Sequence, residues 1–513
     1  MAVSRAHSVA LLGIDGAIVE IEADISSGLP ATVLVGLPDA ALGEAQHRVR
    51  AAAMNSGCPL TRQRLTINLS PAGLPKHGTA FDLGIALAAF AADRVVDPAS
   101  VERLAHLGEL GLDGRLRPIS GILPAVLAAS RAGFDTVMVP AGNAAEAALV
   151  PGVRVVGVAS LREAAVWHGA ELELLDVEPI MPAAPRVVED ADADLCEVIG
   201  NDDAIEAMLA AAAGGHHMFL LGPPGAGKTM LAARLPGILP ELDTDAALEV
   251  NSVRSLAGEP VTGRLSTRPP LEAPHHTATP AALVGGGSRI IRPGAAARAS
   301  HGVLFLDEAA EFSAVALDAL RQPLESGRIT IHRANAVASF PAKFQLLLAA
   351  NPCPCGQHGA PDADADCGCA PYARRRYLAR LSGPLLDRVD IQLRVSRVTA
   401  AQLTAASGNA RLTSAEARER VSAARAAARE RLAGTPWRTN SEVPGSWLRD
   451  TRHRLPAAVT APLDRALERG AISMRGFDRV LRVAWSIADL AGSSSPTAEH
   501  LGRALYFRKA LSS

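Results

Sequence analysis

The spacing of apolar positions divides the chain into regions with different expected structure. Between residues 1 and 175, apolar runs at 18–25, 32–35 and 65–69 have the length of strands, whereas 39–56 and 80–92 show helical periodicity. Residues 176–194 lose this periodicity and are rich in proline and acidic residues, as expected of a linker. We therefore predict an α+β domain at 1–175, a linker at 176–194, an α/β domain at 195–398 and a helical domain at 399–513.

The second domain opens with a strand, a glycine-rich loop and a helix. The apolar run 218–221 is followed by G-P-P-G-A-G-K-T and by a helical segment at 230–235. This pattern is typical of a loop whose backbone N–H groups bind phosphates at a helix N-terminus. It predicts that Lys228 neutralises the β- and γ-phosphates and that the Thr229 hydroxyl binds Mg²⁺. The predicted phosphate-binding residues are Gly222, Pro223, Pro224, Gly225, Ala226, Gly227, Lys228 and Thr229.

A second apolar strand, 303–306, ends in the acidic pair Asp307 and Glu308. After a phosphate-binding loop, such a pair predicts that Asp307 binds the metal ion and that Glu308 polarises the water that attacks the γ-phosphate. The alternative is a buried strand followed by two solvated acids. A further strand at 344–350 ends at Asn351, whose amide is placed to orient that water and to sense the γ-phosphate.

Four of the six cysteines lie close together as two C-x-C pairs, Cys353 with Cys355 and Cys367 with Cys369. Disulfides are not expected in a cytoplasmic protein, and four thiolates suit tetrahedral Zn²⁺. The spacing departs from the commoner C-x₂-C, so free thiols in a loop remain the alternative. We predict a structural zinc site within an insertion at 353–369.

Between the two nucleotide motifs, the Gly-, His- and Pro-rich stretch 274–294 predicts a projecting loop or hairpin. His275 and His276 lie in it, and adjacent loop histidines more often form local hydrogen bonds than bind metals. After the acidic pair, a helix leads into a strand at 328–331, and residues 333–336 predict a hairpin turn.

Composition narrows the function only a little. The chain carries 51 Lys and Arg against 53 Asp and Glu, a net charge of −2. Residues 370–513 nevertheless hold 25 basic against 12 acidic residues, which favours either a surface that faces nucleic acid or a solvated helical surface. The N-terminus is a poor signal peptide, and no apolar run approaches the ~20 residues that span a bilayer. We expect a cytoplasmic protein without membrane contact.

Two segments of the first domain, 75–84 and 108–121, resemble the proteolytic domain of Lon proteases. Those proteases use a Ser/Lys dyad. The serine position falls on Ala80 and the lysine position on Leu123, and neither side chain supports that chemistry. The resemblance implies an inactive Lon-protease-like domain used for assembly or substrate contact. Without a nucleophile, Lys76 is expected to be a surface or phosphate contact.

The remaining motifs resemble AAA+ ATPases similar to the magnesium chelatase ATPase subunit. They are the phosphate-binding loop, the acidic pair, Asn351, L-L-D-R-V-D at 385–390 and S-M-R-G at 473–476. Together with N-P-C-P-C-G at 351–356 and R-V-L-R-V-A-W-S-I-A-D-L at 479–490, they identify the chain as a member of the YifB/ComM family. The implied fold is a P-loop AAA+ core with a helical C-terminal lid, preceded by the Lon-protease-like domain.

That resemblance also implies a function. It implies a homo-hexameric ring that binds ATP and Mg²⁺ between subunits, binds single-stranded or branched DNA, and migrates DNA branches during recombination of DNA taken up by natural transformation. Arg388 resembles an arginine finger that acts in trans, and Arg475 a sensor that acts in cis. In related hexameric motors, the insertion before the acidic strand and the hairpin after it face the central pore. By similarity, Arg289 and Arg292 of the insertion and Arg333 of the hairpin become candidate DNA contacts. The alternative is a chaperone-like ATPase that remodels a protein complex, as in magnesium chelatase.

Overall fold

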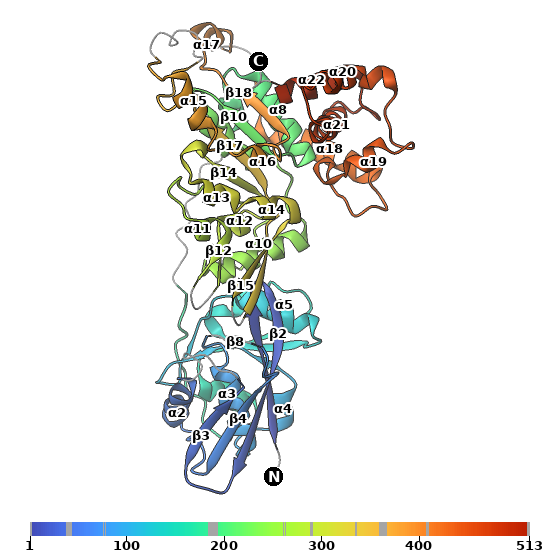
Figure 1. The fold of residues 1–513 in the computed structure, drawn as a ribbon. Coiled ribbons are helices and arrows are strands. Elements are labelled where there is room, and N and C mark those ends of the chain that lie inside the picture. The colour runs from blue at the N-terminus through green and yellow to red at the C-terminus, as the bar shows by residue number, and fades with distance from the viewer. Residues whose placement is uncertain are drawn as a thin grey trace.

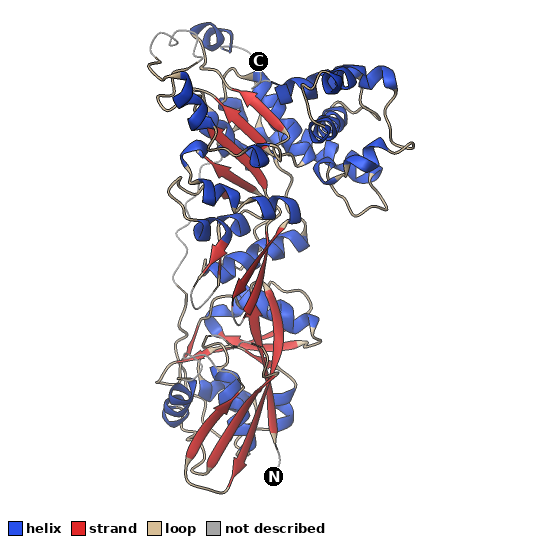
Figure 2. Cartoon of the chain, viewed as in Figure 1, coloured by secondary structure: helices blue, strands red, loops and turns tan. Residues whose placement is uncertain are grey.

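The computed structural model describes residues 3–36, 44–74, 76, 78–182, 193–259, 261, 263–287, 291–333, 336–358, 367–406 and 410–509. The molecule is elongated, with the N-terminal domain at one end and the C-terminal helices beside the far end of the second domain (Figure 1). Strands gather in the first two domains, whereas the chain beyond residue 400 contains only helices among its described elements (Figure 2).

A seven-stranded mixed sheet forms the N-terminal domain, in the order β3-β4-β2-β1-β5-β8-β9. Its strands are β1 (Ser4–Leu12), β2 (Asp15–Ser26), β3 (Ala31–Val35), β4 (Arg64–Ser70), β5 (Ala105–His106), β8 (Thr136–Pro140) and β9 (Arg154–Val158). Helix α3 (Asp82–Ala92) packs against β1 and β2 and is buried along almost its whole length. Helices α2 (Ala45–Asn55) and α4 (Pro98–Glu102) cover its outer side, so a helix that is apolar on nearly every side is buried here.

The second domain is built on five parallel strands in the order β11-β14-β17-β10-β18. They are β11 (Leu271–Glu272), β14 (Val303–Leu306), β17 (Gln345–Ala350), β10 (Met218–Leu221) and β18 (Ile391–Arg394). Every residue of β10, β14 and β17 is buried, as expected for parallel strands covered on both faces. Because the strands are parallel, the loops that follow them meet at one edge of the sheet.

The C-terminal helices share a hydrophobic core with one face of this sheet. Helix α8 (Asp202–Gly214) contacts both α18 (Ser414–Arg431) and α21 (Met474–Leu490), and helix α9 (Lys228–Ile238) contacts α18. Buried residues of β10 and of α21, such as Leu220 and Val480, belong to one cluster. Helices α20 (Ala457–Glu468) and α22 (Ala498–Lys509) pack together, and α22 also contacts β18. The helical lid is therefore joined to the core sheet by apolar contacts.

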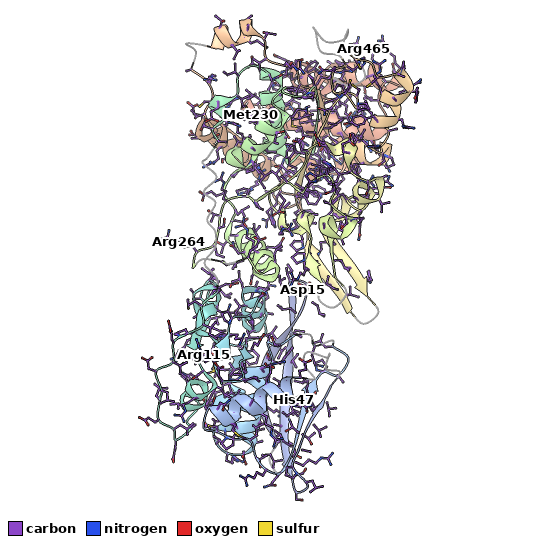
Figure 3. The ribbon with its side chains drawn as sticks, turned by 90° about the vertical axis from the view of Figure 1, so that its left-hand side faces the viewer. Asp15, His47, Arg115, Met230, Arg264 and Arg465 are labelled. Carbon is purple, nitrogen blue, oxygen red and sulfur yellow. The ribbon has the colours of Figure 1, made fainter. Side chains whose placement is uncertain are left out.

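A hairpin of the core touches the N-terminal domain. It consists of β15 (Arg328–Arg333) and β16 (Ala336–Pro341). At the turn between β1 and β2, Ile14 donates its N–H to the carbonyl of Ser339, with 3.3 Å between N and O. Gly13 has a φ of +73°, and a Cβ there would lie 2.1 Å from the same oxygen. Figure 3 shows Asp15 at this junction, 3.7 Å from Arg328.

The structure confirms the expected fold class, an α/β chain with a parallel core sheet and a helical C-terminal region. The helix expected at 39–56 is observed as α2, while residues 37–43 lie outside the described part of the chain. The hairpin expected at 274–294 is the short pair β12 (Gly285–Gly286) and β13 (Arg292–Pro293). Among the described helices, none is both long and apolar enough to cross a bilayer.

Candidate functional site

The glycine-rich loop lies at the edge of the core sheet where β10 ends. Leu221 is the last residue of β10, and α9 begins at Lys228. Gly225 and Gly227 have φ angles of +77° and +87°, a region in which a side chain is strained. The backbone can therefore turn tightly between strand and helix, which leaves the N–H groups at the α9 N-terminus available to an anion.

Lys228 and Asn351 are brought together in this loop. The Nζ of Lys228 donates to the carbonyls of Gly222 and Pro223 at 2.7 and 3.0 Å, and to Asn351 Oδ1 at 3.2 Å. Burial lowers the pKa of Lys228 from its ordinary value. Asn351 reaches the loop because β17 lies beside β10 in the sheet. The sensor strand and the phosphate-binding loop thus meet at one ammonium group.

The acidic pair lies at the same edge, at the end of β14. The Thr229 hydroxyl donates to Asp307 Oδ2 at 2.7 Å, so the two expected Mg²⁺ ligands are adjacent. Glu308 has a left-handed backbone, with φ +50°, and its carboxylate lies 3.1 Å from His276 Nδ1. Two oxygen ligands beside a phosphate-binding loop fit Mg²⁺, which would neutralise charge on the phosphates.

For His276 the structure shows a distant partner instead of the local hydrogen bond that the sequence favours. This histidine lies in the loop after β11, the strand next to β14, so its ring meets the Glu308 carboxylate across that sheet edge. Its neighbour His275 bonds locally, with Nδ1 2.9 Å from Thr277 Oγ1, as expected. His276 lies 32 residues before Glu308 in the sequence, and the pairing of β11 with β14 brings the two together.

The four cysteines converge beyond Asn351. All four Sγ atoms lie within 4.8 Å of one another, and Cys353 Sγ lies 3.3 Å from Cys355 Sγ and 3.8 Å from Cys367 Sγ. Zn–S bonds of about 2.3 Å in a tetrahedron place sulfur atoms about 3.8 Å apart. The N–H of Gln357 lowers the pKa of Cys355 to about 7. The donor set therefore fits Zn²⁺ in number, spacing and chemistry.

Arg388 and Arg475 lie at the opposite edge of the sheet. Ile391, three residues after Arg388, pairs with Met218 at the start of β10, and Asp390 donates its N–H to the His217 carbonyl. The four residues of β10 separate this point from the phosphate-binding loop, about 13 Å along the strand. Arg475 Nη1 lies 3.1 Å from Asp387 Oδ2 and so belongs to the same edge.

The structure consequently brings neither arginine to the phosphate-binding loop of its own chain. The trans role of Arg388 stays a prediction. For Arg475 the placement departs from the expected contact in cis, because α21, which carries Arg475, begins beside the segment before β18 rather than over the loop after β10. A cleft of about 1030 Å³ opens here between core and lid. Its lining includes Arg388, Arg475, Arg479 and Arg482.

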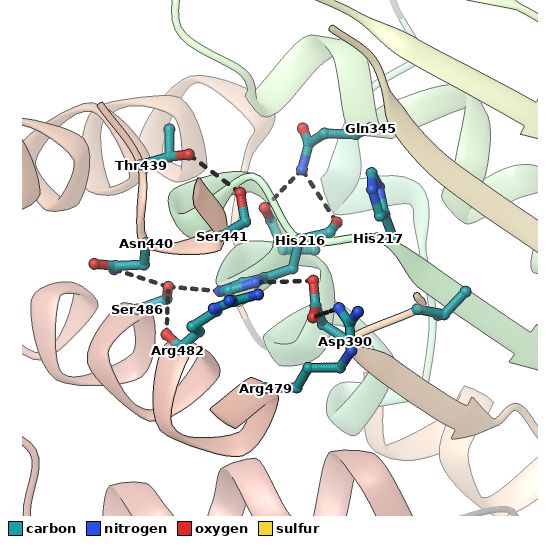
Figure 4. A network of polar contacts seen from close by, with 12 residues as sticks. His216, His217, Gln345, Asp390, Thr439, Asn440, Ser441, Arg479, Arg482 and Ser486 are labelled. Atoms are coloured by element: carbon teal, nitrogen blue, oxygen red, sulfur yellow. Dashed lines mark hydrogen bonds and ion pairs between the residues drawn. The ribbon is translucent and has the colours of Figure 1, made fainter. Parts of the chain in front are cut away.

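A buried polar network holds the Arg388 segment against the lid (Figure 4). Arg479 donates to the Arg388 carbonyl at 3.0 Å and to Asp390 Oδ1 at 2.5 Å. On the other side of Asp390, Oδ2 lies 3.3 Å from His216 Nδ1, and His216 Nε2 lies 2.8 Å from Ser486 Oγ. Burial alone would raise the pKa of Asp390, but these two partners hold it well below its usual range.

Three arginine Nε atoms in this cleft are buried without a hydrogen-bond acceptor among the described residues. They belong to Arg388, Arg479 and Arg482. Arg388 also donates to the Pro384 carbonyl at 2.7 Å and pairs with Glu325.

The candidate DNA contacts are only partly described. Arg292 is exposed on β13, whereas Arg289 lies outside the described residues. Arg333 ends β15, but its side chain is outside the description. The two hairpins adjoin, because a Cβ at Gly285 would lie 3.3 Å from Ile331 Cδ1.

In the N-terminal domain, the expectation for Lys76 is wrong. Its side chain is fully buried, and Nζ donates to the carbonyls of Gly36 and Pro71 at 3.0 and 2.5 Å. Lys76 therefore connects two loops by buried hydrogen bonds rather than lying at the surface. Of the two dyad positions, Leu123 is completely buried in an apolar cluster with Ile122, and Ala80 carries no functional group.

The chain matches three models of known protein families. A family model described as "Magnesium chelatase, subunit ChlI" matches residues 194–403, one described as "Subunit ChlI of Mg-chelatase" matches 21–143, and its C-terminal counterpart matches 411–508. A Lon protease of Mycolicibacterium smegmatis is 33% identical over 27% of the chain and 18% of its own length.

Full-length relatives are closer. An uncharacterized protein of Mycobacterium tuberculosis is 51% identical, over 99% of both chains. Competence protein ComM of Haemophilus influenzae is 40% identical over 99% of this chain and 98% of its own, and YifB of Escherichia coli is 36% identical over 99% and 97%. The chain therefore belongs to the YifB/ComM family of AAA+ ATPases, which is related to subunit ChlI of magnesium chelatase.

Proposed function

We propose that this protein is a Mg²⁺-dependent ATPase whose sites are completed between neighbouring subunits of a hexameric ring, and that the ring migrates branches in DNA. One observation carries the first half of the proposal. Lys228 and Arg388 lie at opposite edges of one sheet. In the proposed ring, Arg388 of one chain would therefore act at the phosphate-binding loop of the next chain.

In the proposed site, the loop at 222–229 binds the triphosphate of one subunit, and Thr229 and Asp307 hold Mg²⁺. Glu308 polarises the attacking water, and Asn351 orients it. The neighbour supplies Arg388, and Arg475 from the same edge, to the developing negative charge.

DNA is proposed as the substrate because of the two adjoining hairpins and the relatives. Arg292 is exposed on one hairpin, and Arg333 ends a strand of the other. A relative covering the full length bears the name competence protein. The four cysteines are proposed to hold a structural zinc ion. Remodelling of a protein complex, as the name magnesium chelatase suggests, is the second candidate function.

Mixed subunits test the site, and DNA tests the substrate. Lys228→Ala and Arg388→Ala should each lose hydrolysis, and mixing the two should restore part of it. Only a mixed ring contains interfaces with both an intact loop and an intact arginine. No recovery in mixed rings would contradict completion in trans.

The ATPase rate with single-stranded or four-way-junction DNA should exceed the rate without DNA, with Lys228→Ala as the control. A rate in assembled rings that ignores both DNAs would instead favour protein remodelling.

A further inference from the structure

The loop that carries the first two cysteines continues directly from the sensor strand. Asn351 follows β17, and Cys353 comes two residues later with its side chain fully buried. The N–H of Gly356 returns to the Cys353 carbonyl at 2.9 Å, so residues 353–356 form a tight turn. The cysteine loop and the γ-phosphate sensor are therefore one continuous segment.

This turn packs against the phosphate-binding loop. A Cβ at Gly356 would lie 2.6 Å from Pro224 Cδ, and the same atom would lie 3.9 Å from Asn351 Cγ. Gly356 also has a φ of +77°, so both the space and the backbone exclude a side chain. The contact joins the cysteine loop to Pro224, in the middle of the glycine-rich loop.

Arg397 makes a second link between the same two segments. Its Nε donates to the Pro224 carbonyl at 3.1 Å, and its Nη2 donates to Gln357 Oε1 at 3.3 Å. Arg397 comes from the segment after β18, the strand on the other side of β10. Pro224 is thus contacted from two directions, by Gly356 directly and by Arg397, which also bonds Gln357.

We propose that zinc bound by the four cysteines braces the phosphate-binding loop through Gly356 and Gln357, and so sets the affinity for nucleotide. The inference rests on the zinc site and nucleotide site proposed above. A bound metal fixes its ligand segments because the bonds exist only in the folded site. Removing it frees the turn, and Pro224 loses its support. The phosphate-binding loop, rich in glycine, then samples other conformations.

The size of the effect follows from the population of the binding conformation. If the freed loop adopts that conformation about one tenth of the time, the apparent Kd for nucleotide rises about tenfold. A zinc module that served only to contact DNA would leave this Kd unchanged and would weaken DNA binding instead. The contact with Pro224 favours the nucleotide loop as the element that the metal supports.

The test compares zinc content and nucleotide affinity in wild type, Cys355→Ser, Arg397→Ala and the matched control Cys196→Ser. Cys196 lies outside the cluster, in a short turn before α8. Wild type and Cys196→Ser should contain one zinc per chain by mass spectrometry of metals and bind a fluorescent ATP analogue equally. Cys355→Ser should lose zinc and bind the analogue about tenfold more weakly. Arg397→Ala should keep zinc and weaken binding by a smaller factor.

Stripping zinc from wild type with a mercurial reagent and a chelator, then restoring it, gives the same comparison without a substitution. Absence of zinc from wild type, or loss of zinc with an unchanged Kd, overturns the proposal. Zinc-loaded wild type that binds no nucleotide at all overturns the ATPase itself, so the two failures are distinguishable. Anisotropy with labelled four-way-junction DNA reports whether metal loss acts on DNA binding alone, an outcome that also overturns it.

Discussion

Replacing Arg479 by alanine should destabilise the joint between core and lid. Asp390 is only 3% exposed and accepts hydrogen bonds from Arg479 at 2.5 Å and from His216 at 3.3 Å. Removing one partner of a buried ion pair costs 3–5 kcal/mol when the remaining charge is left alone. Because His216 stays beside the carboxylate, we expect the lower end of that range, about 3 kcal/mol.

Scanning calorimetry measures this loss. The unfolding entropy is roughly 2.1 cal/mol/K per residue, so for core and lid together, about 320 residues, each kcal/mol lowers the unfolding midpoint by about 1.5 °C. The transition of core and lid should therefore fall by about 4–5 °C in Arg479→Ala. Arg449→Ala is the matched control. It also removes an arginine from a pair with an α21 aspartate, Asp478, but the Arg449 side chain is 38% exposed. Such an exposed pair contributes at most about 1 kcal/mol.

Hydrolysis should fall as well, at temperatures far below the transition, because Arg479 also donates to the carbonyl of Arg388. The fall should be in kcat more than in KM, since the phosphate-binding loop at the other edge is untouched. If Arg479→Ala shifts the midpoint no further than Arg449→Ala, Asp390 does not depend on Arg479. The network would then be incidental to the position of Arg388.

Three further outcomes are expected. Glu308→Gln should keep ATP binding and lose at least about a hundredfold in hydrolysis rate, measured by phosphate release, because the water loses its base. Burial lowers the pKa of His168 to about 4 and that of its partner His106 well below 6.5. For these two histidines the unfolded chain takes up protons first as the pH falls from 6.5 to 4, which lowers the melting temperature of the N-terminal domain across that window. Asp82 of the same domain, whose pKa burial raises to about 6, offsets part of this fall because the folded state takes up its proton first. Gly13→Val should separate the N-terminal domain from the core hairpin at Ser339, seen as faster limited proteolysis between them; unchanged cleavage would refute the contact.

The nucleotide edge could be predicted from the sequence because its residues follow strand ends. The phosphate-binding loop, the acidic pair and Asn351 each come directly after an apolar run, and parallel strands bring such positions to one edge. The cysteine cluster was also predictable, because all four cysteines lie within residues 353–369 and so short a segment can bring their side chains together. In these cases the sequence shows the residues locally, and a general rule of parallel sheets or the short spacing of the cysteines supplies the rest.

The contacts that sequence reasoning missed lie between distant segments. His276 meets Glu308 because β11 pairs with β14. Lys76 looked like a surface base because its two carbonyl acceptors, in Gly36 and Pro71, give no signal in the sequence. The placement of Arg475 depends on where the lid packs, which is set by apolar contacts between α21 and α8 rather than by the motif around the arginine.

Side chains of the lid bind the chain segment at the far edge of the sheet. Arg479 and Arg508 of the lid helices α21 and α22 bind the backbone carbonyls of Arg388 and Val389, and Arg475 binds Asp387. A displacement of the lid relative to the sheet would break these contacts or carry the arginine segment with it. In a ring completed in trans, that segment enters the neighbour's site, so lid position in one subunit would govern hydrolysis in the next. The loop held by the proposed zinc ion would meanwhile stabilise each subunit's own phosphate-binding loop. One edge of the sheet would then bind the subunit's own nucleotide, and the other edge would promote hydrolysis in the neighbouring subunit.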